Sequence, residues 1–167
     1  MTERVPEQQY GALPWRRTDG VEILLITSRQ TRRWLTPKGW PIDGLSPSEG
    51  AAQEAYEEAG VRGVANGQSL GSYSYEKKLR EGVGRLCRVA MFSLEVTETL
   101  ENWPESHERE RRWFTAEEAA DLVGEPALAA IIRDFARDQS APAMQAPTYL
   151  REVLQRLTNA LRRVAAL

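Results

Sequence analysis

The chain has 167 residues, with 22 lysines and arginines against 24 aspartates and glutamates, which gives a net charge of −2 at pH 7. This length fits one domain with a hydrophobic core and a small appendage, and the slightly acidic balance argues against general nucleic-acid binding. The single Cys87 excludes an internal disulfide and a cysteine zinc site, while the N-terminal residues and the short apolar run 23–26 predict a soluble, cytoplasmic protein without membrane contacts.

Runs rich in β-branched, aromatic and aliphatic residues, bounded by turn residues, predict a series of strands. These strands span residues 10–15, 21–28, 34–36, 71–77, 86–96 and 111–114. Capping boxes, or a proline at the first helical position, predict helices over 47–59, 115–123 and 126–137. Because strands and helices do not alternate strictly, we expect an α/β domain of the α+β type, with a mixed sheet between helical layers.

Residues 138–147 combine proline, alanine and polar residues and predict a linker, so the expected domain covers residues 1–137. Beyond the linker, apolar residues recur at steps of four and three and predict an amphipathic helix over 148–167: Leu150, Leu154, Leu157, Leu161 and Val164. Two alternatives are open for this helix. It packs on its own domain, or it forms a homodimer.

The helix over 47–59 carries the most informative residues of the chain. Ser46 and Glu49 predict an N-terminal capping box, and Gly60 predicts a left-handed C-terminal cap. Positions i, i+3 and i+4 of this helix share an arc of roughly 100° on one face, and they hold Glu54, Glu57 and Glu58. Carboxylates crowded this closely repel one another, and a bound hard cation such as Mg²⁺ is the usual reason for a fold to tolerate them.

The segment from Gly39 to Val61 resembles the Nudix box, G-x5-E-x7-R-E-U-x-E-E-x-G-U, in which U is a bulky aliphatic residue. The residues that match in register are Gly39, Glu54, Glu57, Glu58, Gly60 and Val61. Leu45 and Gln53 stand where the box has its first Glu and its Arg, which pair with each other in the family. Removing one partner of a buried pair costs on the order of 3–5 kcal/mol, whereas replacing both is expected to be nearly neutral.

The resemblance extends to residues 10–15, 22–27, 34–39 and 111–114, which are similar to the diphosphoinositol polyphosphate phosphohydrolase branch. It implies a Nudix-like fold with an extra C-terminal helix, and a pyrophosphatase that uses Mg²⁺, with Mn²⁺ as the alternative cofactor. The implied metal ligands are the carboxylates of Glu54, Glu57 and Glu58 and the backbone carbonyl of Lys38. The general base is open between Glu54 and an acid of the loop that holds Glu105, Glu108 and Glu110, among which we choose Glu108.

Basic residues cluster around the box and in two later segments, although the chain as a whole is acidic. Arg offers bidentate contacts to phosphate and Lys a point charge. We therefore predict that a phosphorylated small molecule binds to Arg32, Arg33, Lys38, Lys77 and Arg88. For any single cluster, the alternative is a solvated charged surface.

Three functions follow as hypotheses. The first is hydrolysis of a polyphosphorylated small molecule, either a diphosphoinositol polyphosphate or a dinucleoside polyphosphate. The second is hydrolysis of a nucleoside triphosphate or a nucleoside diphosphate derivative. The third is a non-catalytic binding module, which Leu45 and Gln53 make plausible and the retained carboxylates argue against.

Overall fold

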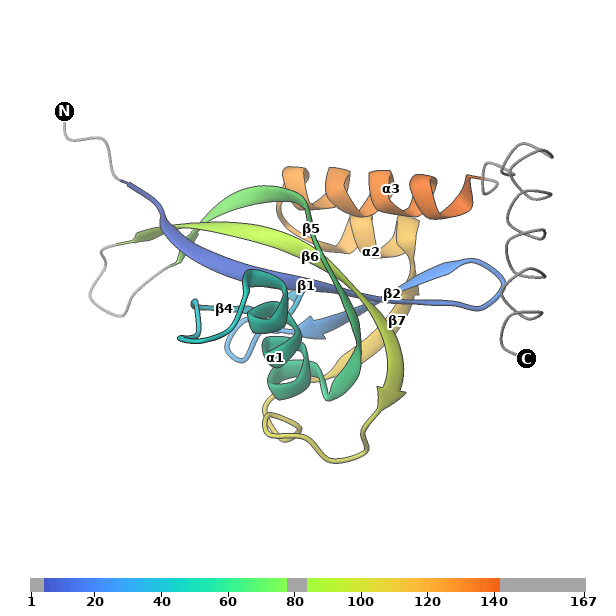
Figure 1. Cartoon of the computed structure of the whole chain (residues 1–167), viewed down its shortest axis with the longest axis horizontal. Coiled ribbons are helices and arrows are strands. Elements are labelled where there is room, and N and C mark those ends of the chain that lie inside the picture. Colours follow the sequence, from blue (N-terminus) through green and yellow to red (C-terminus); the bar gives the residue numbers. More distant parts are fainter. Residues whose placement is uncertain (1–4, 78–83, 142–167) are drawn as a thin grey trace, which may run out of the picture.

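The structure, a computed structural model, describes residues 5–77 and 84–141 (Figure 1). The expected helix over 148–167 and most of the expected linker lie outside these residues, so the homodimer stays a prediction. The strands are β1 (Glu7–Arg17), β2 (Val21–Thr27), β3 (Trp34–Leu35), β4 (Lys38–Gly39), β5 (Val61–Lys77), β6 (Arg85–Thr99) and β7 (Arg111–Thr115). The helices are α1 (Pro47–Ala59), α2 (Ala116–Leu122) and α3 (Pro126–Ser140). In the described part of the chain, no helix has both the length and the apolar character needed to cross a membrane.

All the strands belong to one seven-stranded sheet, in the order β3-β2-β1-β6-β5, with β4 added to β1 and β7 added to β2. β1 and β6 pair in parallel, from Glu7 opposite Cys87 to Trp15 opposite Glu95. The other pairs are antiparallel. The sheet is therefore mixed, and the predicted fold class is confirmed.

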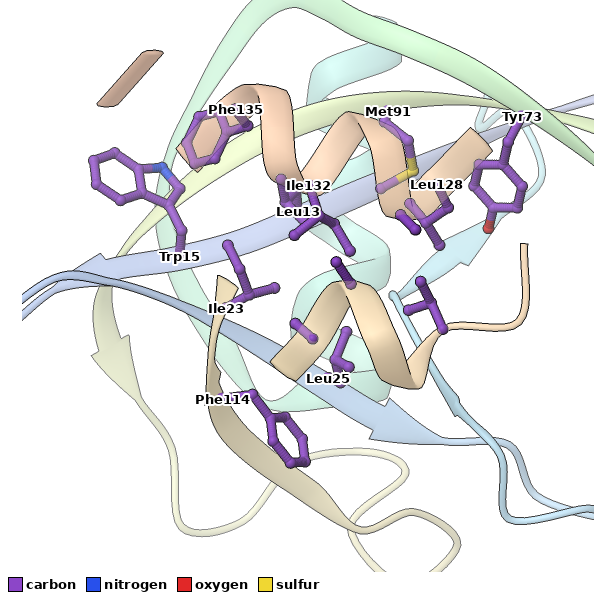
Figure 2. Close-up of a cluster of buried hydrophobic side chains, with 14 of the residues drawn as sticks. Leu13, Trp15, Ile23, Leu25, Tyr73, Met91, Phe114, Leu128, Ile132 and Phe135 are labelled. Atoms are coloured by element: carbon purple, nitrogen blue, oxygen red, sulfur yellow. The ribbon is translucent and has the colours of Figure 1, made fainter. Parts of the chain in front are cut away.

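Helices cover both faces of the sheet, α1 on one side and α2 with α3 on the other (Figure 1). Under α1 the core is built from small helical residues, Ala51, Ala55 and Ala59, which let the helix approach the strands closely. The core under α2 and α3 is larger, as Figure 2 shows. Its labelled members are Leu13, Trp15, Ile23, Leu25, Tyr73, Met91, Phe114, Leu128, Ile132 and Phe135.

The structure differs from the predicted elements in several places, among them the ends of β1 and β6, which extend beyond the predicted ranges 10–15 and 86–96. β5 begins at Val61 rather than at residue 71, β4 was not predicted, and α3 continues to Ser140 rather than ending near 137. The missed half of β5 contains Gly63, Asn66 and Gly67, which are poor strand formers. This half forms because β6 pairs with it, with irregular register between Ala65 and Ser69.

Candidate active site

Local signals in the sequence fix both ends of α1. The Ser46 hydroxyl accepts a hydrogen bond from the Glu49 N–H (3.4 Å), and the Glu49 carboxylate accepts one from the Ser46 N–H (2.8 Å). The same contacts lower the pKa of Glu49. At the other end, Gly60 has a φ of 63° and a ψ of 39°, a left-handed conformation that favours glycine. Both predicted caps are confirmed.

The segment between β6 and β7 lies against the C-terminal end of α1 (Figure 1). Two donors of this segment reach carbonyl oxygens of the last helical turn: the Glu105 N–H binds that of Glu57 (3.1 Å), and Trp103 Nε1 binds that of Glu58 (3.2 Å). Arg111, the first residue of β7, binds the carbonyl oxygens of Ala59 (2.8 Å) and Gly60 (3.1 Å) through Nη1. The Arg111 guanidinium also lies 3.9 Å from the centroid of the Trp103 ring. α1 has no basic residue in its last turn. This segment therefore supplies the donors and the positive charge that a helix C-terminus attracts.

Glu54 occupies the space that Gly39 leaves by having no side chain. A β-carbon added at Gly39 would lie 1.9 Å from Glu54 Oε1 and 2.6 Å from Glu54 Oε2. Burial, together with the charges of Glu58, Glu57 and Glu105, raises the pKa of Glu54 to about 7. Within the described residues, no hydrogen bond or ion pair reaches this carboxylate. The glycine of the box and its first carboxylate are thus one structural unit.

Glu57 and Glu58 follow on the same helix, but each already has a partner. Glu57 Oε1 accepts a hydrogen bond from Gln53 Nε2 at 2.6 Å. Glu58 Oε2 accepts one from the Lys38 backbone N–H at 3.0 Å, and Glu58 Oε1 lies 2.5 Å from Arg109 Nη2. Burial nevertheless raises the pKa of Glu58 against these favourable contacts.

The two residues that depart from the box, Leu45 and Gln53, differ in their contacts. Gln53 keeps a role as a donor, because its amide binds Glu57. Leu45 is 41% exposed and belongs to neither buried core cluster. Neither replacement puts a charged side chain at these two positions, and the near-neutral effect of replacing both stays a prediction.

The loop acids separate into an inner and an outer set. The Glu105 carboxylate binds Arg109 Nε at 2.5 Å and contributes to the raised pKa of Glu54, so it faces the box. Glu108 is half-exposed and pairs with Arg29 at 3.1 Å, while Glu110 pairs with Arg32 at 3.5 Å. Neither outer acid is among the charges that raise the pKa of Glu54. The structure therefore brings Glu105 to the site in place of the predicted Glu108.

Most of the predicted phosphate-binding arginines are held by acids. Arg32 donates to the Glu108 backbone carbonyl (3.1 Å) in addition to its pair with Glu110, and it has a positive φ of 56°. Arg33 lies 3.6 Å from Glu125, the residue that precedes α3. These contacts join the turn after β2 to the segments before β7 and α3. Their first structural role is to hold this turn in place.

Lys38 and Lys77 differ from these arginines, because neither forms an ion pair within the described residues. The Lys38 ammonium lies 5.2 Å from the centroid of the Tyr75 ring, and that of Lys77 lies 5.3 Å from the Trp40 ring. Burial lowers the pKa of Lys38, while the charges of Glu58 and Glu125 act to raise it and those of Arg109 and Lys77 act to lower it. Two lysines that lie near each other and form no ion pair among the described residues are candidates for contact with an anionic ligand.

Arg88 is not part of this pair of cations. It lies opposite Ser74 in the β5–β6 ladder, whereas the neighbouring Tyr75 lies opposite Cys87. Because side chains alternate between the two faces of a sheet, Arg88 points to the other face from Tyr75 and Lys77. The structure thus brings together Lys38 and Lys77 among the predicted cations, and separates Arg88 from them.

The donor atoms of the site fit a hard divalent cation. Carboxylate oxygens are the ligands that Mg²⁺ takes in proteins, and Glu54 is a partly buried carboxylate whose pKa is raised by desolvation and by its acidic neighbours. Within residues 5–77 and 84–141, however, no three Asp, Glu, His or Cys side chains converge into a ready-made metal site. In this arrangement Glu57 is bound by Gln53 and Glu58 by Arg109.

Comparison with known proteins assigns the chain to a protein family. The family model described as NUDIX domain matches residues 8–135. The chain is 37% identical over 121 residues to Nudix hydrolase 12, mitochondrial, from Arabidopsis thaliana, which covers 70% of this chain and 59% of that protein. It is 38% identical over 105 residues to diphosphoinositol polyphosphate phosphohydrolase 3-alpha from Mus musculus, covering 61% and 60%. The chain belongs to the Nudix family.

The fold is also similar to that of solved structures. An Ap4A hydrolase from C. elegans superimposes with a TM-score of 0.59 at 17% identity, over 81% of this chain and 100% of that one. This likeness concerns the fold alone. The chain spans about 60% of the length of the curated relatives that it matches.

Sequence reasoning located the carboxylates of α1 and missed the partners that hold them. These partners are Arg109, Arg111 and Trp103. Their contacts with α1 bridge 45 to 52 positions of sequence, as the separations of their hydrogen bonds show. Their spacing within the loop gives no local signal of these contacts.

Proposed function

We propose that the chain is a divalent-metal-dependent hydrolase that cleaves a pyrophosphate linkage in a polyphosphorylated small molecule. The observation that carries this proposal is the unit formed by Gly39 and Glu54. The pKa of Glu54 is about 7, and its carboxylate has no partner in the described residues. A partly buried carboxylate with this pKa suits the acceptance of a proton from water at neutral pH.

The roles of the remaining residues follow from their positions. Glu54, Glu57 and Glu58, with the Lys38 carbonyl, would hold Mg²⁺ or Mn²⁺, which lowers the pKa of bound water and offsets phosphate charge. The Lys38 N–H fixes the orientation of Glu58. The ammonium groups of Lys38 and Lys77 would hold the phosphates next to the scissile linkage. The name of the mouse relative supports a diphosphoinositol polyphosphate as the substrate, and a dinucleoside polyphosphate is the other form of this first candidate.

The second candidate is a nucleoside triphosphate or a nucleoside diphosphate derivative. One observation favours it: Arg29, Arg32 and Arg33 are paired with Glu108, Glu110 and Glu125. Two lysines that form no ion pair among the described residues suit a ligand with few phosphates better than one with many. The third hypothesis, a binding module without catalysis, fits the site less well. Binding alone does not require a carboxylate such as that of Glu54, whose pKa of about 7 lets it accept a proton at neutral pH.

A substrate panel decides among these candidates. Phosphate release would be measured with Mg²⁺ and with Mn²⁺ for a diphosphoinositol polyphosphate, a dinucleoside polyphosphate, a nucleoside triphosphate and a nucleoside diphosphate sugar. Preference for the first two, with kcat/KM falling steeply as salt rises, supports the first candidate. Preference for the last two replaces it with the second. No hydrolysis of any phosphoanhydride by the folded protein overturns the enzymatic proposal.

The substitution Lys38→Met tests the phosphate contact in the same panel. It removes the ammonium group and keeps the backbone N–H that binds Glu58. We expect KM to rise more than kcat falls, because binding common to substrate and transition state is removed. Arg33→Gln is the matched control, since Arg33 is held by Glu125. Equal effects of the two substitutions would contradict the role of Lys38.

A further inference from the structure

One buried cation stands inside the cluster of carboxylates. The Arg109 side chain is 7% exposed, and each of its guanidinium nitrogens has a partner. Nη2 lies 2.5 Å from Glu58 Oε1, Nε lies 2.5 Å from Glu105 Oε2, and Nη1 lies 3.1 Å from the Thr27 carbonyl oxygen. Arg109 therefore joins α1, β2 and the segment before β7 at the place where acidic charge is most concentrated.

Both oxygens of Glu58 are occupied in this arrangement, one by Arg109 and the other by the Lys38 N–H. A cation that is to coordinate Glu58 must therefore replace or share one of these contacts. The backbone N–H belongs to β4, which is fixed by its pairing with β1. The guanidinium is the partner that has a side chain able to move.

We propose that Arg109 is the built-in counter-ion of the site and competes with the divalent metal for Glu58. This inference rests on the proposed function. In the metal-free protein, Arg109 neutralises Glu58 and Glu105 and so keeps the acidic cluster folded. When a divalent cation binds, it takes over that role at Glu58, and Arg109 keeps Glu105 and the Thr27 carbonyl. Arg109 is thus a positioning residue that sets the metal affinity of the site.

The competition makes a prediction that a purely structural ion pair does not make. Removing Arg109 leaves the buried Glu58 and the partly buried Glu105 without the cation that pairs with them, so the metal-free protein loses stability. The same change removes a positive charge from beside the metal position, so the affinity for the metal rises. A ligand that binds only the folded state then restores the lost stability as its concentration increases.

The test uses the full chain and Mn²⁺ as the probe. Binding would be titrated by electron paramagnetic resonance of free Mn²⁺, and thermal melting would be recorded with chelator and with saturating Mn²⁺. For Arg109→Gln we expect a lower Tm in chelator, about tenfold or more tighter Mn²⁺ binding, and a larger gain in Tm from Mn²⁺ than in the unaltered protein. The matched control is Arg112→Gln, because Arg112 is exposed and lies over Phe114. It should behave like the unaltered protein in both measurements.

Several results of these measurements would decide for or against the inference. Unchanged or weaker Mn²⁺ binding by folded Arg109→Gln, or a Tm loss as large at saturating Mn²⁺ as in chelator, would show that Arg109 is only a structural ion pair. If Arg109→Gln does not fold in chelator, Arg109→Lys takes its place, since it keeps the charge without the forked contacts. Lysine makes a weaker contact with Glu58 than the forked guanidinium does, so the competition predicts tighter Mn²⁺ binding by Arg109→Lys than by the unaltered protein, by a smaller factor than for Arg109→Gln. Unchanged or weaker binding overturns it. If the unaltered protein binds no Mn²⁺, the metal assignment of the proposed function fails as well.

Discussion

The contact between Gly39 and Glu54 gives a test that separates function from folding. In Gly39→Ala, the new β-carbon would lie 1.9 Å from Glu54 Oε1 if nothing moved. Ordinary contact between non-bonded atoms begins at roughly 3.5 Å, so the carboxylate must move by roughly 1.5 Å. The atoms in the way are the end of a flexible side chain and not backbone. The carboxylate is therefore expected to rotate away while the strands stay in place.

The expected consequence is a large loss of activity with little loss of stability. Misplacement of a reacting group by roughly 1 Å can cost on the order of 10²-fold in rate. The backbone at Gly39 has no positive φ, so alanine is compatible with it. The free energy of unfolding should then change by less than about 1 kcal/mol. kcat/KM with Mg²⁺ on the best substrate of the panel, and urea unfolding, measure the two quantities.

Gly20→Ala is the matched control, because a β-carbon at Gly20 meets nothing within 4 Å. It should leave both kcat/KM and stability near the values of the unaltered protein. Activity of Gly39→Ala equal to that of the control would refute the reasoning, since Glu54 would then not be needed where the structure places it. A loss of several kcal/mol in stability would also refute it, because it would show that the backbone and not the carboxylate gives way.

Further expectations concern the box and its helix. Glu58→Gln should lower metal-dependent hydrolysis by on the order of 10²-fold or more with the fold retained, and full activity of this variant in the presence of a chelator would exclude catalysis by the box. Leu45→Glu and Gln53→Arg together should preserve stability better than the sum of the single changes; a double-mutant cycle measures the coupling, and strict additivity would mean that the two positions do not communicate. Ser46→Ala should lower the free energy of unfolding by about 1 kcal/mol through loss of the N-cap, and unchanged urea unfolding would show that the Ser46 hydroxyl contributes nothing.

Features encoded within a few residues were predictable from the sequence. The capping box of Ser46 and Glu49 and the glycine cap at Gly60 depend on contacts within one helical turn, and both are present. The fold class followed from the order of strands and helices in the same way. The first half of β5 was not predictable from its own residues, because Gly63 and Asn66 form a strand only against β6.

The charged residues of the site were likewise predictable only where the signal lies within a few residues of sequence. The i, i+3, i+4 spacing located Glu54, Glu57 and Glu58, since it is a property of one helix. Whether an arginine is free or paired depends on acids far away in the sequence. Arg29 meets Glu108 across 79 positions, and Arg32 meets Glu110 across 78. Charge clusters along the chain therefore overestimated the cations available to a ligand.

The closure of α1 by residues 103–111 sets an order of events during synthesis. The box is complete once residue 61 has been made, but the donors for its last carbonyls and the counter-ion of Glu58 arrive up to 50 positions later. At roughly 5–20 residues per second, that interval lasts several seconds. β1 also lacks one of its partners during this interval, because β6, with which it pairs in parallel, begins only at Arg85. A nascent chain halted in this interval exposes an acidic helix and the edge of β1 that later pairs with β6, and these are the surfaces that a chaperone would have to shield.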